Sequence, residues 1–332
     1  MTATLNPAGP AIDAGPAPAP APRRARSGAA RQRIEVVLLV APALVLFLGF
    51  VILPVILAAV YSLYNLPPAF RWEHLADPDR FIGLANYERA FQSPEFVRAI
   101  GNNFVILIAS LLIQGPLAIG IALLLNRPLR GRAVLRLLIF VPYVLAEVIA
   151  GLAWKLLLQP TGGVNAMLES LGLGFLQQNW LADPSIALWT LFWILTWKYL
   201  GFAIILMLAG LQGVPEELAE AAAIDGASWW QIQRYITIPL LGPTIRIWAF
   251  LSMIGALQLF DMVWVTVAPT VRGMATETMA TYMVQQGQFA GQPGYGSAIA
   301  VILFFISLIV ALVYQRLALR RDLAGAVTRG VR

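Results

Sequence analysis

The stretch EELAEAAAIDGASWWQIQRYITIPL, residues 216–240, decides how this chain is organised. Four acids lie within its first ten residues, although long apolar segments flank it on both sides. Pro215 followed by Glu216 and Glu217 is typical of a helix start, because proline fits the first turn and acids stabilise the positive end of the helix dipole. Gly226 is typical of a helix end. The stretch therefore predicts two short helices joined by a glycine turn, the first with a small, alanine-rich surface.

The chain as a whole has the composition of an integral membrane protein. Of its 332 residues, 59% are hydrophobic and 12% are charged, whereas soluble domains are about 45–50% apolar and about 25% charged. The net charge of +6 does not indicate nucleic acid binding, because the basic residues cluster beside apolar segments, as membrane topology requires. The absence of cysteine excludes disulfides and thiolate metal sites, and His74, the one histidine, cannot form a zinc site alone. We therefore expect no metal or other cofactor in this chain.

Six segments are long and apolar enough to cross a bilayer, which takes about 20 residues. They are Val36–Leu63, Phe104–Leu125, Leu135–Leu157, Ile186–Leu211, Leu240–Val267 and Ala298–Leu317. Residues 1–33 are rich in alanine and proline and then in arginine, which is typical of a disordered basic tail. We therefore expect an all-α, six-helix membrane domain over residues 34–318, followed by a cytoplasmic tail over residues 319–332, with the two short helices (about 215–238) between helices four and five.

Arginine residues predict the orientation of these spans. Five lie in the N-terminal tail, four lie between the second and third spans, and five follow Gln315. Cytoplasmic loops are enriched in lysine and arginine, so we expect these three regions, and with them both termini, on the cytoplasmic side. With six spans, the stretch at 216–240 is then cytoplasmic as well.

The spacing within this stretch resembles the EAA motif of ABC importer permeases, which runs E-A-A, three residues, G, nine residues and then I-x-L-P. Here it reads Glu220-Ala221-Ala222, Gly226 and Ile236-Thr237-Ile238-Pro239, with Ile238 in place of leucine. Other stretches resemble permeases of carbohydrate uptake systems of the maltose and glycerol-phosphate type: FIGLANYERAF (81–91), IGNNF (100–104), LRGRAVLRLLIFVPYVL (129–145) and LQLFDMVWV (257–265). The segment VTVAPTVRG (265–273) departs from this family, which often carries a glycine pair after the fifth span.

The resemblance implies one permease subunit of an importer in a bacterial inner or plasma membrane. Such permeases work as pairs, here expected to be a heterodimer, and each inserts its EAA helix into one of two ATPase subunits. An extracellular solute-binding protein delivers the sugar. This chain lacks the G-x-x-x-x-G-K-[ST] phosphate loop, so it is not expected to be an enzyme, and ATP and Mg are expected in the partner ATPase. By the family match, the ATPase contact would be made by Glu217, Glu220, Ala221, Ala222 and Gly226.

Ionisable residues inside membrane spans are costly and usually face a cavity or a partner. The expected spans contain Glu147, Lys155, Lys198, Arg246 and Asp261. The match of LTWKYLGF (195–202) to maltose-type permeases places Lys198, Tyr199 and Phe202 near sugar-contacting positions, and on the fifth span it places Gln258 and Asp261 there. Aromatic rings suit the apolar faces of a sugar, and polar groups suit its hydroxyls. Alternatively, Lys198 and Asp261 form a buried ion pair that holds two helices together.

Other functions stay open at this point. A permease of this kind could carry another small solute, such as a glycerol-phosphate diester, an amino acid or a peptide, and a lysine in the pathway would suit an anion. A membrane enzyme should show clustered His, Asp or Glu at a membrane face, whereas the acids at 216–225 lie beside alanines. A passive scaffold does not explain charges within the fourth and fifth spans. The carbohydrate motifs favour a sugar without identifying it.

Overall fold

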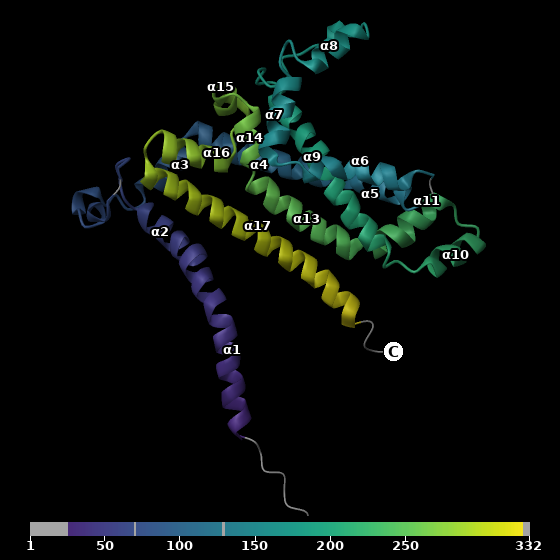
Figure 1. The fold of residues 1–332 in the computed structure, drawn as a ribbon, viewed down its shortest axis with the longest axis horizontal. Helices are drawn as coiled ribbons and strands as arrows, with labels where there is room; N and C mark the ends of the chain where they lie inside the picture. Colours follow the sequence, from purple (N-terminus) through teal and green to yellow (C-terminus); the bar gives the residue numbers. More distant parts are fainter. Residues whose placement is uncertain (1–25, 70, 128–129, 328–332) are drawn as a thin grey trace, which may run out of the picture. The chain divides into compact units, whose positions relative to one another are not determined.

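The computed structural model describes residues 26–69, 71–127 and 130–327, which are helical apart from turns and one isolated antiparallel bridge between Tyr64 and Phe81 (Figure 1). The chain divides into a short N-terminal unit that ends at Pro54 and a main unit that begins at Val55. The N-terminal unit contains α1 (Arg26–Phe47) and the π-turn η1 (Leu48–Ile52), and α2 (Leu53–Tyr61) leads from it into the main unit. Helix α1 thus begins within the segment expected as a tail, of which residues 1–25 lie outside the described residues.

The main unit is built from helices of very different lengths. In chain order they are α3 (Ala85–Gln92), α4 (Pro94–Ala109), α5 (Gly115–Leu125), α6 (Arg132–Val144), α7 (Glu147–Leu157), α8 (Gly163–Ser170), α9 (Ala187–Leu211), α10 (Glu216–Ile224), α11 (Trp229–Ile232), α12 (Ile238–Leu240), α13 (Gly242–Leu257), α14 (Asp261–Thr266), α15 (Pro269–Val271), α16 (Met279–Val284) and α17 (Pro293–Val327). Short 3-10 or π-turns lie between them: η2 (Trp72–Leu75), η3 (Pro78–Arg80), η4 (Ser110–Gln114), η5 (Gly174–Leu176), η6 (Gln233–Thr237), η7 (Arg272–Thr276) and η8 (Gln285–Phe289).

Four helical segments of the described residues are each long and apolar enough to cross a membrane. They are Val36–Tyr61, Pro94–Leu125, Ala187–Leu211 and Pro293–Ala318. The second begins ten residues earlier than expected, because Ser93 caps a helix that continues without interruption into the apolar segment. The third predicted span is bent instead of straight, because α6 and α7 meet at 99°. The fifth predicted span, Leu240–Val267, is preceded by a bend of 66° between the segment Trp229–Leu240 and α13, and it is divided into α13 and α14. If each bent pair is one span, the total is up to six.

Proline explains three irregular turns within long helices. The π-turns η1, η4 and η6 each end two residues before a proline, which is Pro54, Pro116 and Pro239 respectively. Proline has no N–H to donate, and its ring clashes with the carbonyl four residues earlier. A wider π-turn moves that carbonyl aside, so the helix passes the proline without ending.

Two apolar clusters hold the main unit together. One contains Phe96, Leu191, Leu257, Met262, Met279 and Ile299, among others, and joins α4, α9, α13, α14, α16 and α17. The other contains Ala122, Ala203, Ile204, Met207, Leu241 and Trp248 and joins α5, α9 and α13. Helix α9 contributes to both clusters, so it is the central element on which the two bent spans pack.

The asparagine pair in IGNNF stabilises the last carbonyls of α13 and the backbone that precedes α16. Asn103, fully buried, donates to the carbonyls of Ala256 (2.6 Å) and Leu257 (3.3 Å) and accepts from the N–H of Met279 (2.9 Å). Its neighbour Asn102 donates to the carbonyls of Ala275 (2.9 Å) and Glu277 (2.8 Å). Irregular backbone at membrane depth is stable only where its polar groups find such partners.

Replacement of Asn103 with leucine is expected to destabilise the fold by about 2–4 kcal/mol, because one buried amide and two carbonyls lose their partner. Thermal unfolding in detergent, followed by size-exclusion chromatography, measures the effect. Asn126, exposed at the end of α5, provides the matched control as Asn126→Leu. Equal unfolding temperatures for the two variants would show that these hydrogen bonds contribute little.

Candidate functional site

The helix pair α10–α11 has the local structure that its sequence predicts. Helix α10 ends in a Schellman motif, in which the Ala227 N–H donates to Ala222 O (2.9 Å) and the Gly226 N–H donates to Ala223 O (3.0 Å). Gly226 has φ +84°, a left-handed conformation that other residues adopt only with strain. The next helix, α11, begins behind a capping box formed by Ser228 and Gln231, so both sides of the glycine turn are fixed by local hydrogen bonds.

The helix pair presents most of its side chains outward. Glu217, Glu220, Ala221 and Gly226 are exposed and Ala222 is half-buried. Ile224, the last residue of α10, is 87% exposed. A hollow of about 380 Å³ lies at the turn, lined by Asp225, Gly226, Ala227, Gln231, Ile232, Tyr235 and Ile236. The helix pair thus presents an exposed surface with a hollow at its turn.

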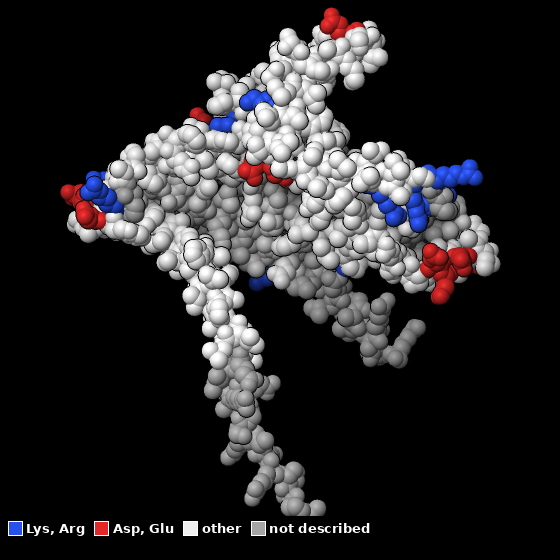
Figure 2. All heavy atoms as spheres, viewed as in Figure 1, with Lys and Arg blue, Asp and Glu red and all other residues white. Residues whose placement is uncertain are grey.

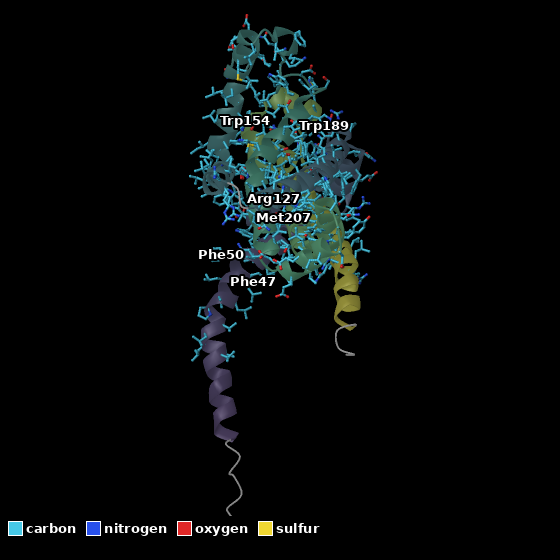
Figure 3. The ribbon with its side chains drawn as sticks, turned by 90° about the vertical axis from the view of Figure 1, so that its right-hand side faces the viewer. Phe47, Phe50, Arg127, Trp154, Trp189 and Met207 are labelled. Carbon is cyan, nitrogen blue, oxygen red and sulfur yellow. The ribbon has the colours of Figure 1, made fainter. Side chains whose placement is uncertain are left out.

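Acidic and basic residues meet at this end of the main unit. Figure 2 shows the acids of α10 as a patch beside a basic patch over the α5–α6 connection. The acids are Glu216, Glu217, Glu220 and Asp225, and the arginines are Arg127 and Arg130 in the connection and Arg132 and Arg136 at the start of α6. The guanidinium of Arg127 lies 5.1 Å from the ring centroid of Trp229, which joins α11 to that connection. Figure 3 shows Arg127 and Met207 at one level of the unit, with Trp154 and Trp189 nearer to α8.

A cavity of about 320 Å³ opens between the central helices of the main unit. Its lining comes from η4 (Ser110, Gln114), α6 (Tyr143), α9 (Phe192, Leu195, Tyr199, Phe202), α13 (Trp248, Leu251, Ser252, Gly255, Ala256) and Leu259. None of these described lining residues carries a charged side chain. The volume lies within the range of small-molecule pockets, and the mixture of aromatic rings with few polar groups is typical of them.

Aromatic residues form one side of this cavity. The rings of Tyr143 and Phe202 stack with centroids 5.0 Å apart, and the Tyr199 ring meets Tyr143 edge-on at 6.4 Å. The Tyr199 hydroxyl donates to Glu147 Oε1 at 2.7 Å. The fourth predicted span and the bent third span therefore share one aromatic wall.

Short polar side chains form the other side. Ser110 Oγ donates to Gln114 Oε1 (2.5 Å), and the hydroxyls of Ser110 and Ser252 lie 2.7 Å apart. These hydrogen bonds link η4 to α13 across the cavity wall.

Of the five pathway residues predicted from sequence, only Tyr199 and Phe202 line this cavity. Gln258 and Asp261 lie at the break between α13 and α14 and are exposed in this single chain. Lys198 does not point into the cavity: it is 2% exposed, and its ammonium lies among the carbonyls of Pro142, Tyr143 and Leu145.

The predicted alternative of a Lys198–Asp261 ion pair does not describe the arrangement either. Lys198 Nζ lies 3.9 Å from Glu147 Oε1, so the acid that balances it comes from the first residue of α7. The sequence placed Lys198 correctly on the fourth span but did not identify its partner. Glu147 reaches Lys198 because α6 and α7 meet at an angle of 99°, which a straight third span would not allow.

A second buried ion pair lies outside the membrane-spanning segments. Arg272 and Glu277 are 3% and 4% exposed, with Arg272 Nε 3.8 Å from Glu277 Oε1. Burial raises the pKa of Glu277 and lowers that of Arg272, while their opposite charges act against both shifts. The Arg272 guanidinium also lies 4.0 Å from the ring centroid of Trp264. Arg272 lies in the segment VTVAPTVRG (265–273), which contains the end of α14, all of α15 and the start of η7, and no pattern in the sequence indicated this ion pair.

Sequence reasoning missed the polar residues that shape the cavity and its surroundings. Ser110, Gln114 and Ser252 gave no signal among apolar neighbours, and Asn103 was noticed only within a quoted motif. Glu147 was recognised as an intramembrane acid that either lines the pathway or satisfies a neighbouring helix, and the structure pairs it with Lys198. Among the described residues, no group of three or more His, Cys, Asp or Glu is arranged to hold a metal ion.

Comparison with known proteins yields one family and many relatives. Residues 114–322 match the family described as binding-protein-dependent transport system inner membrane component. A probable ABC transporter permease of Pyrococcus horikoshii is 34% identical, over 84% of this chain and 94% of the relative. The permease of the arabinooligosaccharide transport system of Bacillus subtilis is 31% identical over 85% and 87%. That of the trehalose/maltose system of Thermococcus litoralis is 32% identical over 86% and 94%.

Solved structures show the same fold. A chain of a bacterial ABC transporter involved in the import of the acidic polysaccharide alginate superposes with a TM-score of 0.76 at 25% identity, covering 90% of this chain and 99% of that one. A second structure of the alginate transporter, in complex with an alginate pentasaccharide-bound periplasmic protein, also gives 0.76, at 26% identity over 90% and 98%.

Proposed function

The chain belongs to the family of binding-protein-dependent transport system inner membrane components, and we propose that it is one of two permease subunits of an ABC importer for a sugar. The observation that carries the proposal is the exposed helix–glycine–helix unit of α10 and α11 in a chain whose relatives are named as sugar permeases. In this proposal the sugar arrives on an extracellular solute-binding protein and crosses a bacterial inner membrane. ATP and Mg bind to two ATPase subunits and not to this chain.

The α10–α11 unit is proposed to be the coupling element. Glu217, Glu220, Ala221, Ala222 and Gly226 would enter a groove on one ATPase subunit, where exposed acids meet basic side chains or N–H donors. The small residues let the partner approach the backbone, and the Schellman turn and the capping box fix the backbone on both sides of Gly226. These local hydrogen bonds support the coupling role, because a motion of the ATPase could then be transmitted to α9 and α13 at either end.

The proposal includes six spans with both termini in the cytoplasm. The bent pair α6–α7 counts as the third span, and the fifth span begins with α13, after the bend that separates it from the segment Trp229–Leu240. Support comes from the charges: the arginines of the α5–α6 connection lie at the same end of the unit as α10 (Figure 2), as positive-inside topology requires.

The cavity is proposed to be this chain's half of the sugar pathway. Tyr143, Tyr199 and Phe202 offer rings for the apolar face of a sugar, and Ser110, Gln114 and Ser252 offer exchangeable hydrogen bonds. Gln258 and Asp261, exposed at the edge of α13 and α14, would join the pathway or face the second permease, proposed to be a different chain.

An uncharged sugar fits this half-site better than an anion. No described residue that lines the cavity is charged, and the nearby ammonium of Lys198 is fully engaged with carbonyls and Glu147. An anionic solute would lose its hydration here without gaining a cation from this chain. The alternative of a glycerol-phosphate diester is therefore not favoured.

The test is copurification of the tagged chain, expressed with its neighbouring genes, followed by an ATPase assay. The binding protein is supplied after incubation with maltose, with lactose or with an alginate pentasaccharide. We expect a second permease and an ATPase to copurify, and activity to rise with a neutral sugar. Purification without an ATPase would refute the permease assignment, and stimulation by the acidic oligosaccharide alone would refute the argument from charge.

A further inference from the structure

The break between α6 and α7 leaves backbone carbonyls without helical partners. Helix α6 ends at Val144, Leu145 and Ala146 are extended, and α7 starts at Glu147 at 99° to α6. The last carbonyls of any helix lack an N–H donor from their own helix. At membrane depth water does not supply one, and each unsatisfied carbonyl costs several kcal/mol. A break at this place therefore needs donors from another helix.

Lys198 of α9 supplies those donors. Its ammonium donates to the carbonyls of Pro142 (3.1 Å), Tyr143 (3.0 Å) and Leu145. An ammonium has three N–H bonds, and here each of them has an acceptor. With the side chain 2% exposed, Lys198 has neither a donor nor a free surface left for a ligand.

Glu147 completes the arrangement from the other side of the break. Its Oε1 lies 3.9 Å from Lys198 Nζ and accepts the hydroxyl of Tyr199 at 2.7 Å. Its Oε2 is buried, and within the described residues it has no hydrogen-bond partner. The carboxylate thus balances the buried ammonium and ties α7 to the residue that follows Lys198. We call Lys198, Glu147 and the three carbonyls the Lys198 clamp.

The clamp reaches the cavity through two tyrosines. Tyr143 gives its carbonyl to the ammonium, while its ring lines the cavity and stacks on Phe202 at 5.0 Å. Tyr199 gives its hydroxyl to Glu147, while its ring lines the same wall. Tyr199 cannot turn without losing its hydrogen bond to Glu147, whereas the clamp fixes the backbone of Tyr143 and the stack on Phe202 holds its ring.

We propose that Lys198 is a positioning residue that does not touch the transported solute. It fixes the α6–α7 break and thereby holds Tyr143 and Tyr199 in the positions in which they bind that solute. That the solute is a sugar depends on the proposed function, but the role of Lys198 in fixing the break does not. The clamp differs from an ordinary buried ion pair because its main acceptors are backbone carbonyls. A residue with the same charge and a different donor geometry cannot replace lysine.

The first experiment measures hydrogen–deuterium exchange of the amides at 143–149 in the full-length chain, purified with the subunits that accompany it. Lys198→Met is expected to raise their exchange rate about tenfold or more, because the break opens locally once its carbonyls lose their donors. Lys198→Arg is expected to raise it as well, since a planar guanidinium does not fit three converging carbonyls. The matched control is Lys155→Met, which removes a half-buried lysine from α7 itself.

Each outcome decides the proposal. Unchanged exchange in Lys198→Met, or wild-type exchange in Lys198→Arg, would overturn it, the latter because charge alone would then suffice. If Lys198→Met does not assemble, the charge-balanced pair Lys198→Met/Glu147→Gln replaces it. Fast exchange in that pair supports the clamp, and slow exchange refutes it.

A second measurement separates positioning from mere structure. With the sugar that stimulates the ATPase, whether maltose or lactose, we expect Lys198→Met to raise the apparent KM of uptake about tenfold while the maximal rate changes less. A fall in maximal rate at constant KM would contradict the positioning role. Failure of every sugar to stimulate the ATPase would refute the proposed function and leave the exchange result standing.

Discussion

Glu220→Lys is expected to reduce uptake and binding-protein-stimulated ATPase activity by about 100-fold, at the upper end of what coupling between two sites contributes. Glu220 is exposed on α10, within the E-A-A triplet that precedes the Schellman turn. If that surface enters a groove of the ATPase, the variant places a lysine against the basic side chains or N–H donors that would otherwise bind the Glu220 carboxylate. Like charges placed against each other across an interface weaken binding by several kcal/mol. Because Glu220 is exposed, the substitution leaves the fold of the chain itself unchanged.

The chain offers a matched control for this variant. Glu169 is an exposed acid near the end of α8, which projects beyond α7 in a different part of the main unit from α10 (Figure 1). Glu169→Lys makes the same change of charge and should leave coupling unchanged. Quantitative copurification reports whether the ATPase stays bound. Wild-type uptake by Glu220→Lys would show that α10 is not the coupling element.

Gly201→Ala is expected to destabilise the packed main unit by about 3 kcal/mol, and Gly201→Leu to prevent its assembly. A Cβ at position 201 would lie 2.2 Å from the carbonyl oxygen of Ile139 and 3.0 Å from Cα of Phe140. These are backbone atoms of α6, so no side-chain rotation can relieve the overlap. Only a shift of α6 away from α9 would, and it would disturb the clamp three residues earlier on α9.

The comparison for this prediction is Gly120→Ala in α5. A Cβ there meets nothing within 4 Å, and alanine is the better helix former. The yield of monodisperse protein and its unfolding temperature in detergent measure both variants. Equal behaviour of Gly201→Ala and Gly120→Ala would mean that α6 and α9 are not in such close contact in the assembled protein.

The two predictions test different parts of one proposed mechanism. Glu220 lies on the surface where motion would enter the chain, and Gly201 lies where α9 contacts the bent third span. Gly201 belongs to α9, which runs without interruption from Ala187 to Leu211 and also carries Lys198, Tyr199 and Phe202 in its middle. A continuous helix that joins the proposed docking element to a cavity wall is the kind of connection by which one site can act on the other.

Much of the candidate site was predictable because its signals are local. The helix start at Glu216, the stop at Gly226 and the exposure of the acids depend on residues within one or two turns, and the structure confirms the helices and the turn. The resemblance carried by the same residues predicted the family, which the comparisons confirm. The contacts of α10 with an ATPase stay a prediction.

Lys198 shows where such reasoning ends. The sequence marked it as a costly charge inside a span and offered two explanations, a sugar contact or a pair with Asp261. Its partners in the structure, the carbonyls at 142–145 and the acid at 147, are some 50 residues away in sequence. Backbone carbonyls carry no mark in a sequence, and only the break in the third span makes them available.

The sequence by itself determined that this chain is a helical membrane protein, where its apolar segments lie and how its acidic interruption folds. Hydropathy and helix capping act over a few residues, and at membrane depth a helix satisfies its own hydrogen bonds. The tertiary structure decided which spans bend, which residues line the cavity and which acid balances Lys198. Those outcomes depend on donors and acceptors from different helices, which satisfy one another only after α4, α6, α9 and α13 have packed together.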